Sequence, residues 1–191
     1  MNQHIDNVTI FIYTMHERLE PIMTKKEAPI IQTERLVLRP RAERDIPNML
    51  QMFNHEEVRK YLGINPPRGE HAMIEMIRNR TETKWTVALK ETDEFIGDVM
   101  IPTIAEGYLG EIGYRFMREH WGCGFAYESV SAVIEHCRSN LHLKRLSATI
   151  DNENVQSKKL IEKLGFTLVA VLPESNLMGR VTDVAYYSRM V

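Results

Sequence analysis

The chain has 191 residues, 43% of them hydrophobic, and a formal net charge of −2 at neutral pH. This length suits one domain that buries its own core, and the near-neutral charge gives no electrostatic footprint for nucleic acid beyond a local basic patch. The two cysteines are too few for a disulfide framework, and no apolar run reaches the roughly 18 residues of a membrane-spanning helix. Because no signal-peptide pattern is visible near its start, we expect a cytoplasmic protein with no direct nucleic-acid partner and no membrane partner.

Residues 1–29 are predicted to form an N-terminal extension to a single domain over residues 30–191. An apolar stripe at helical spacing indicates one amphipathic helix in this extension, formed by Val8, Ile12, Met15 and Leu19. Such a helix would pack on the domain or on a second subunit, so a homodimer is one expectation. A disordered extension is the alternative.

The domain should open with a strand and three helices. Leu36 and Leu38 alternate with their neighbours in a strand that Pro40 closes. The first helix should begin at Asp45 as its N-cap, with Pro47 in the first turn, where a missing N–H costs little. The methionines of these helices suit an adaptable core. The expected helices cover residues 46–53, 58–62 and 73–77.

Three strands follow these helices. Apolar residues alternate on both sides of a polar four-residue turn, which is typical of a hairpin. Pro102 and Gly107 bracket the next turn, and the third strand begins at Glu111. The expected strands cover residues 85–89, 95–101 and 111–117.

A central helix, a strand, a second helix and two closing strands should complete the domain. The central helix begins near Gly124, presents one apolar face and stops at Asn140. The second helix ends at Gly165, which suits the left-handed residue just beyond a helix, with Phe166 packing back behind it. The expected elements cover residues 124–139, 146–150, 155–164, 167–172 and 184–190.

This order of elements predicts an α+β (mixed α/β) fold. The sheet should be largely antiparallel, with about six or seven strands and helices on both faces. Hairpins outnumber strand–helix–strand units, and the spacing of Gly122 and Gly124 lacks the third glycine of the dinucleotide fingerprint. A doubly wound dinucleotide-binding fold therefore fits poorly.

The start of the central helix is the most informative stretch. The first amides of a helix lack internal partners and usually receive a side-chain cap. Residues 121–124, Trp-Gly-Cys-Gly, offer no side-chain oxygen for this purpose, and the glycines let a ligand approach the backbone closely. Free amides at the positive end of a helix dipole form an anion site, most often for phosphate. A plain tight turn at Gly122 and Gly124 is the alternative.

Three motifs resemble the GNAT superfamily of N-acetyltransferases. Residues 121–126, Trp-Gly-Cys-Gly-Phe-Ala, look like its acetyl-CoA pyrophosphate loop. Residues 151–166 resemble its second signature, with Asp151, Asn154 and Ser157 before the sequence Glu-Lys-Leu-Gly-Phe. Residues 33–39, Thr-Glu-Arg-Leu-Val-Leu-Arg, resemble the start of its RimJ/RimL-type (ribosomal-protein N-acetyltransferase-like) branch.

The resemblance implies an enzyme that moves an acetyl group from acetyl-CoA, its co-substrate, to a primary amine by direct attack in a ternary complex. The strands near residues 111–117 and 146–150 would splay apart around the coenzyme. A protein N-terminal α-amine is the expected acceptor, since its pKa of about 8 leaves more of it neutral than a lysine amine. A small amine or an antibiotic is the alternative. The residues implied in cofactor binding are Tyr114, Phe116, Met117, Trp121, Gly122, Cys123, Gly124, Phe125, Ala126, Asn154 and Ser157.

The resemblance also implies a general base and a hydrogen-bond donor to the leaving sulfur. Glu111 on the splayed strand is the preferred base, and its alternative role is a surface carboxylate paired with Arg115. Glu174 is the second candidate, with a solvated loop acid as its alternative role. Ser157 would serve the sulfur, because Ile161 stands where many family members have a tyrosine. A serine bonded only to a local amide is the alternative for Ser157.

Two other classes of protein stay open at this point. The missing tyrosine at Ile161 is compatible with a CoA-binding module that lacks catalysis, and the glycine loop is compatible with a nucleotide-binding domain. No metal site is expected, because the adjacent His136 and Cys137 cannot both face one site on a helix. Together with His120 and Cys123 they also lack the spacing of a zinc site.

Overall fold

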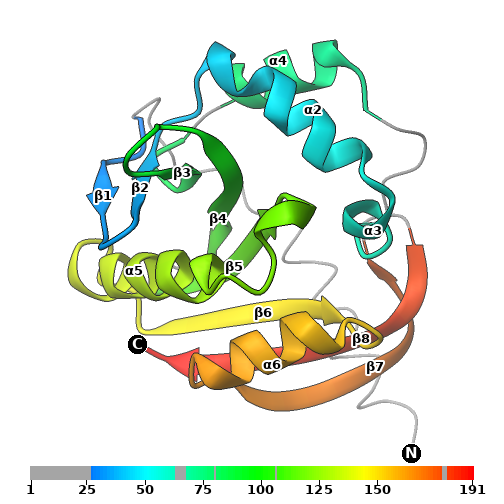
Figure 1. Ribbon diagram of the computed structural model, residues 1–191. Coiled ribbons are helices and arrows are strands. Elements are labelled where there is room, and N and C mark those ends of the chain that lie inside the picture. Colours follow the sequence, from blue (N-terminus) through cyan, green and yellow to red (C-terminus); the bar gives the residue numbers. More distant parts are fainter. Residues whose placement is uncertain (1–26, 63–67, 80, 106, 178–179) are drawn as a thin grey trace, which may run out of the picture.

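The computed structural model describes residues 27–62, 68–79, 81–105, 107–177 and 180–191, so the predicted helix within residues 1–29 lies outside the described part of the chain. One eight-stranded sheet, in the order β1-β2-β3-β4-β5-β6-β8-β7, runs through the domain (Figure 1). Neighbouring strands are antiparallel, except that β5 and β6 are parallel. The strands are β1 (Ile31–Gln32), β2 (Leu36–Arg39), β3 (Lys84–Leu89), β4 (Phe95–Ala105), β5 (Leu109–Phe116), β6 (Arg145–Asp151), β7 (Thr167–Leu177) and β8 (Arg180–Met190).

Helices cover both faces of this sheet, so the predicted fold class and layering are confirmed. Short 3-10 turns, η1 (Glu43–Asp45) and η2 (Arg118–His120), precede α2 and α5. None of the helices in the described ranges is long and apolar enough to span a membrane. The helices are α2 (Ile46–Asn54), α3 (Glu56–Arg59), α4 (Glu70–Arg78), α5 (Phe125–Ser139) and α6 (Val155–Lys163).

The strands differ from the prediction in number and length. The sheet has eight strands rather than six or seven, because the two-residue β1 is too short to show an apolar alternation. β4 continues through Pro102, which the sequence suggested as a turn, and the register shifts between Met100 and Thr103. Proline is tolerated at such irregularities because no ladder hydrogen bond is required there. β7 and β8 also extend beyond their predicted ranges, to Leu177 and back to Arg180.

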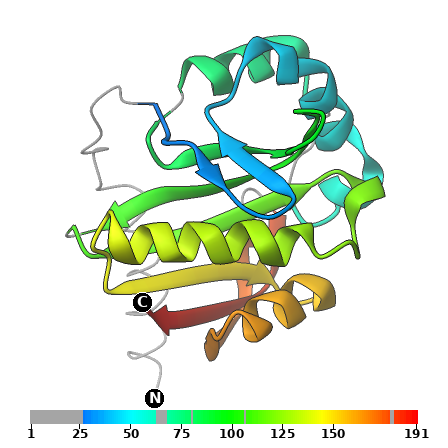
Figure 2. The same cartoon turned by 60° about the vertical axis from the view of Figure 1, so that its left-hand side comes forward.

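Two hydrophobic clusters hold the layers together. The first joins α5 to one sheet face, where Trp85, Val87 and Val130 are fully buried. α5 crosses this face in Figure 2, and α6 packs on the same side through Ile161. The second cluster joins α2 and α4 around Phe95 on the opposite face. Its members are Met49, Met52, Phe53, Val58, Met73, Phe95 and Met117.

The end of α6 agrees with the prediction. Gly165 has a φ of +83°, in the left-handed region. The N–H of Gly165 donates to Glu162 O, and the N–H of Phe166 donates to Ile161 O, at 2.9 and 3.1 Å. This pair of bonds is the Schellman motif, and the buried Phe166 and Ile161 supply its hydrophobic contact.

Asp45 has a different role from the predicted one. Its side chain makes no cap hydrogen bond to α2. Instead, the buried carboxylate accepts two hydrogen bonds from Arg39, at 2.8 and 2.9 Å, and one from the hydroxyl of Thr86. A forked arginine–carboxylate pair is a stronger interaction than a single amide cap, so Asp45 anchors η1 to the sheet.

A second buried carboxylate lies beside it on the α2 face of the sheet. Asp98 is fully buried and accepts hydrogen bonds at 2.8 Å from Arg41 and from both ends of the Arg115 guanidinium fork. Burial lowers the pKa of Arg41, while the charge of Asp98 acts against that shift. Asp98 is therefore the counter-charge for two arginines at once.

We predict that Asp98→Asn destabilises the domain by about 3–5 kcal/mol, because it leaves two desolvated guanidinium groups without a carboxylate. Urea unfolding followed by circular dichroism measures this loss. Asp93→Asn is the matched control, since Asp93 also pairs with two arginines but its side chain is 44% exposed. Equal unfolding midpoints for the two variants would contradict the prediction.

Candidate functional site

A cleft opens where β5 and β6 separate. The two strands pair only from Leu109 to Glu111 of β5, opposite Arg145 to Ser147 of β6. Beyond that point β5 stays paired with β4, and β6 stays paired with β8. The inner edges of residues 112–116 and 148–151 therefore have no strand partner across the gap.

A cleft of about 590 Å³ lies beside this gap. β5, the loop before α5, α6 and the α3 region contribute its walls. The lining residues are Glu57, Val58, Tyr61, Leu62, Tyr114, Arg115, Phe116, Arg118, His120, Trp121, Gly122, Gly124, Ala126, Tyr127, Asn154, Gln156, Ser157, Lys159, Leu160 and Lys163.

The loop before α5 begins the helix without a side-chain cap, as predicted. Gly124 is the N-cap residue with a φ of +81°, and no side chain bonds to the first amides. Gly122 has a φ of +79°. Both values lie in the left-handed region that favours glycine. The 15-residue helix thus presents its positive end and its free N–H groups beside the cleft, which suits an anion.

A pair of hydroxyl groups bridges the cleft between β5 and α6. Tyr114 Oη and Ser157 Oγ are 2.7 Å apart, and Tyr114 Oη also donates to the Ser157 carbonyl at 3.3 Å. Burial raises the pKa of Tyr114 to about 12, although the Ser157 hydrogen bond acts in the opposite direction. Tyr114 therefore keeps its proton at neutral pH.

Asn154 and Ser157 are placed by the cap of α6. The side-chain oxygen of Asn154 accepts a hydrogen bond from the backbone N–H of Ser157 at 3.1 Å. Because Asn154 satisfies that amide, the Ser157 hydroxyl is free to face Tyr114. The alternative in which the Ser157 hydroxyl serves only a local amide does not agree with this geometry.

Most of the predicted cofactor-binding residues line the cleft. Met117 is instead buried in the α2–α4 cluster, while Cys123 and Phe125 flank the loop outside the lining. A contact through the backbone N–H groups of Cys123 and Phe125 stays a prediction, whereas the Met117 N–H already donates to Ile96 O at 2.9 Å. The predicted residues in the lining are Tyr114, Phe116, Trp121, Gly122, Gly124, Ala126, Asn154 and Ser157.

The two predicted bases lie outside the cleft lining. Glu111 occupies the last paired position of β5, opposite Ser147. Its alternative role as the partner of Arg115 is wrong, because Arg115 is bound to Asp98. Glu174 is exposed on β7 with a φ of +47°, and its N–H donates to Asp183. The base role of either residue stays a prediction.

Sequence reasoning missed the residues that close the cleft from α3 and η2. Glu57 pairs with Arg118, whose guanidinium lies 4.9 Å above the Trp121 ring. No local motif signals a pairing over 61 residues. On α6, Lys159 and Lys163 lie four residues apart on one helix face, and that spacing could have indicated a basic edge.

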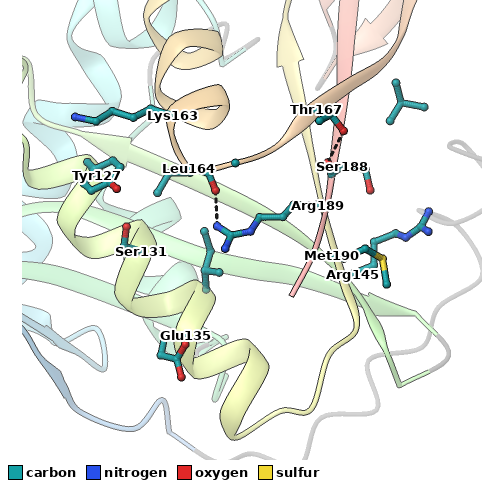
Figure 3. Close-up of a pocket in the computed structure, with 13 residues that line it drawn as sticks. Tyr127, Ser131, Glu135, Arg145, Lys163, Leu164, Thr167, Ser188, Arg189 and Met190 are labelled. Carbon is teal, nitrogen blue, oxygen red and sulfur yellow. Dashed lines mark hydrogen bonds between the residues drawn. The ribbon is translucent and has the colours of Figure 1, made fainter.

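A wider groove of about 850 Å³ continues from the cleft between α5 and α6 (Figure 3). Tyr127 and Lys163 line both spaces, and the Lys163 ammonium lies 4.5 Å from the Tyr127 ring centre. Arg189 donates to the Leu164 carbonyl at the centre of this groove. The end of the cleft at Lys163 is therefore open toward this groove and the solvent.

Comparison with known proteins identifies the class. Residues 35–167 match the Acetyltransferase (GNAT) domain, so the chain belongs to the GNAT acetyltransferase family. It is an acetyltransferase, and acetyl-CoA is its co-substrate.

Bacterial relatives agree with this assignment. The chain is 35% identical to the uncharacterized N-acetyltransferase p20 of Bacillus licheniformis over 167 residues, which cover 83% of this chain and 94% of that one. It is 32% identical over 152 residues to the uncharacterized N-acetyltransferase YoaA of Bacillus subtilis, covering 75% and 86%. It is 28% identical over 118 residues to the ribosomal-protein-serine acetyltransferase of Escherichia coli, covering 61% and 65%.

Solved structures share the fold at low sequence identity. A GNAT-family acetyltransferase from Bacillus anthracis superimposes with a TM-score of 0.78 at 21% identity, covering 85% of this chain and 98% of that one. Spermidine N-acetyltransferase from Vibrio cholerae, in complex with CoA and spermine, gives 0.72 at 21% identity over 83% and 96%. RimL, a ribosomal L7/L12 alpha-N-protein acetyltransferase in complex with coenzyme A, gives 0.70 at 18% identity over 87% and 98%.

The two cysteines should differ sharply in reactivity. Burial raises the pKa of Cys137 to about 12, so its thiol stays protonated and enclosed at pH 8, whereas Cys123 is exposed beside the glycines. We predict that iodoacetamide adds one adduct per native chain, at Cys123, and two after denaturation. Peptide mass mapping identifies the sites. Native labelling of Cys137 at the same rate as Cys123 would contradict the packing described above.

Proposed function

We propose that this protein acetylates a primary amine, with a protein N-terminal α-amine as the preferred acceptor, by direct attack on acetyl-CoA in a ternary complex. The observation that carries the proposal is the continuity of three features in one cleft. These are the unpaired edge of β5, the uncapped start of α5 and the Tyr114–Ser157 hydroxyl pair. An extended thioester with an anionic tail fits this sequence of groups.

The coenzyme would lie along the cleft with its diphosphate at the glycine loop. The N–H groups of residues 121–126 would hold the diphosphate. The backbone of β5 from Tyr114 to Phe116 would pair with the amides of the pantetheine arm, as a missing strand would. Lys159 and Lys163 add positive charge at the anionic end, where the cleft opens into the wider groove.

The chemistry then needs one bond formed and one bond broken. The neutral amine nitrogen attacks the thioester carbonyl carbon, the C–S bond breaks, and the amine loses one proton to a base or to water. The sulfur leaves as a thiolate, which a hydrogen bond from the Ser157 hydroxyl would stabilise. Holding the two reactants in line supplies much of the rate. We retain Glu111 as the proposed base, acting through water because it lies outside the cleft lining.

The Tyr114 hydroxyl would donate to Ser157 Oγ instead of the Ser157 carbonyl, which leaves the serine proton for the sulfur. Tyr114 would thus orient Ser157 rather than transfer a proton itself. With its pKa raised to about 12, Tyr114 is a much weaker acid than a thiol and stays a hydrogen-bonding group. Ile161 cannot serve the sulfur, because isoleucine has no hydrogen-bond donor in its side chain. That side chain is also fully buried in the core beneath α6. Ser157 would therefore donate the hydrogen bond to the sulfur, and Tyr114 would hold Ser157 in position.

Three comparisons bear on the acceptor. The ribosomal-protein-serine acetyltransferase of Escherichia coli and RimL favour a protein N-terminus. The spermidine enzyme of Vibrio cholerae makes a polyamine the second candidate. An α-amine is also neutral at a lower pH than a lysine-type or polyamine nitrogen, so it needs less help from a base that is distant from the cleft.

We predict that the protein releases free CoA from acetyl-CoA in the presence of peptides with free N-termini, and that N-acetylated peptides of the same sequence give none. Thiol release and peptide mass measure the reaction. Turnover with spermidine or aminoglycosides but with no peptide would contradict the peptide assignment.

We further predict that Ser157→Ala lowers kcat about tenfold, the effect of one lost hydrogen bond worth about 1.4 kcal/mol in the transition state. The KM for acetyl-CoA should change less than about twofold, since the diphosphate contacts stay intact. Tyr114→Phe should give a smaller loss in kcat.

Ser131→Ala on α5 is the control for this measurement, because it removes a helical serine hydroxyl that lines the outer groove rather than the cleft. An unchanged kcat in Ser157→Ala would mean that the thiolate leaves without help. That result would remove Ser157 and Tyr114 from the mechanism while leaving coenzyme binding intact.

A further inference from the structure

The segment that leads into β2 reaches the start of α5. The carboxylate of Glu128, one turn into α5, accepts hydrogen bonds from the Thr33 hydroxyl at 2.6 Å and from the Arg35 backbone N–H at 2.9 Å. Its second oxygen binds both Nε and Nη2 of Arg35 at 2.7 Å. Burial acts to raise the pKa of Glu128, but these hydrogen bonds hold it below its ordinary value. The carboxylate is therefore a fixed anchor for Arg35.

From this anchor the Arg35 guanidinium contacts Cys123 and Phe125 and lies against Gly124 between them. Its Nη1 donates to the Cys123 carbonyl at 3.1 Å. Its Nη2 lies 3.3 Å from the position that a Cβ would take on Gly124. Its plane lies 4.6 Å from the ring centre of Phe125. One side chain thus holds the loop from behind.

These contacts lie on the side of the loop that does not line the cleft. Gly122, Gly124 and Ala126 line the cleft, whereas Cys123, Phe125 and Arg35 do not. An anion-binding loop must direct its N–H groups toward the ligand and its carbonyl groups elsewhere. Arg35 provides the partner that turns the Cys123 carbonyl away. Because Glu128 balances its charge, Arg35 acts on the loop rather than on the phosphate directly.

We propose that Arg35, fixed by Glu128 and Thr33, is a positioning residue that preorganises the glycine loop for the coenzyme diphosphate. This inference rests on the proposed function, since it assigns the diphosphate to that loop. It also gives a physical role to Thr33 and Arg35, which precede β2 in the sequence.

Two acetyl donors that differ only in the tail, acetyl-CoA and S-acetylpantetheine, can test this proposal. S-acetylpantetheine carries the thioester and the pantetheine arm but no diphosphate, so the orientation of the glycine loop should not affect it. Arg35→Met keeps an unbranched side chain over Phe125 while removing the guanidinium. We expect this variant to bind acetyl-CoA about tenfold more weakly by calorimetry, and S-acetylpantetheine within twofold of the wild type.

Arg138→Met is the matched control, because Arg138 forms an arginine–glutamate pair with Glu135 at the far end of the same helix. It should bind both donors as the wild type does. If Arg35→Met does not fold, Glu128→Gln removes the anchoring charge at constant size and is expected to show the same selective loss.

Two results would overturn the proposal while the proposed function stands. One is unchanged acetyl-CoA binding by Arg35→Met and Glu128→Gln. The other is an equal loss of binding for both donors, which would mark the cluster as a purely structural link. Failure of the wild-type protein to bind acetyl-CoA at all would instead contradict the proposed function, and this inference with it.

Discussion

The loss of pairing between β5 and β6 is the constraint on which the cleft depends. Both strands keep their outer partners, β4 and β8, so the sheet stays continuous on each side of the gap. The inner edges, however, carry N–H and C=O groups that need a partner when they are enclosed. An extended ligand with amides of its own can supply that partner. The gap therefore suits a ligand that forms the hydrogen bonds of a neighbouring strand. The parallel direction of the two strands also places the start of α5 beside the same opening.

The rigidity of the cleft comes from contacts made on its outer side. Asn154 caps α6 and thereby orients the hydroxyl of Ser157. Asp98 fixes the guanidinium of Arg115 in the wall, and Trp121 donates its indole N–H to the Phe116 carbonyl at 3.0 Å. These parts of the cleft wall are thus held by hydrogen bonds to residues behind them. Such an arrangement reduces the reorganisation required when the substrate binds.

The sequence predicted the features that depend on local order and missed those that depend on distance along the chain. The uncapped start of α5 and the Schellman end at Gly165 follow from neighbouring residues, and both are confirmed. The two-residue β1 and the passage of β4 through Pro102 depend on register with other strands, which no periodicity records. Asp45 was misread because its partner, Arg39, satisfies it more strongly than a helix cap would. The entry of α3 into the cleft was missed for the same reason, since it depends on tertiary packing.

The division of the interior into two clusters has an evolutionary consequence. The cluster under α5 supports the glycine loop and the splayed strands, whereas the methionine-rich cluster under α2 and α4 supports the α3 wall of the cleft. Within the described part of the chain, Trp121 packs against both. If the donor binds in the cleft as proposed, substitutions in the methionine-rich half would reshape the space opposite the thioester and leave the half that holds the donor unchanged. Under the proposed function, the acceptor would then change in small steps while the indole at the junction is kept.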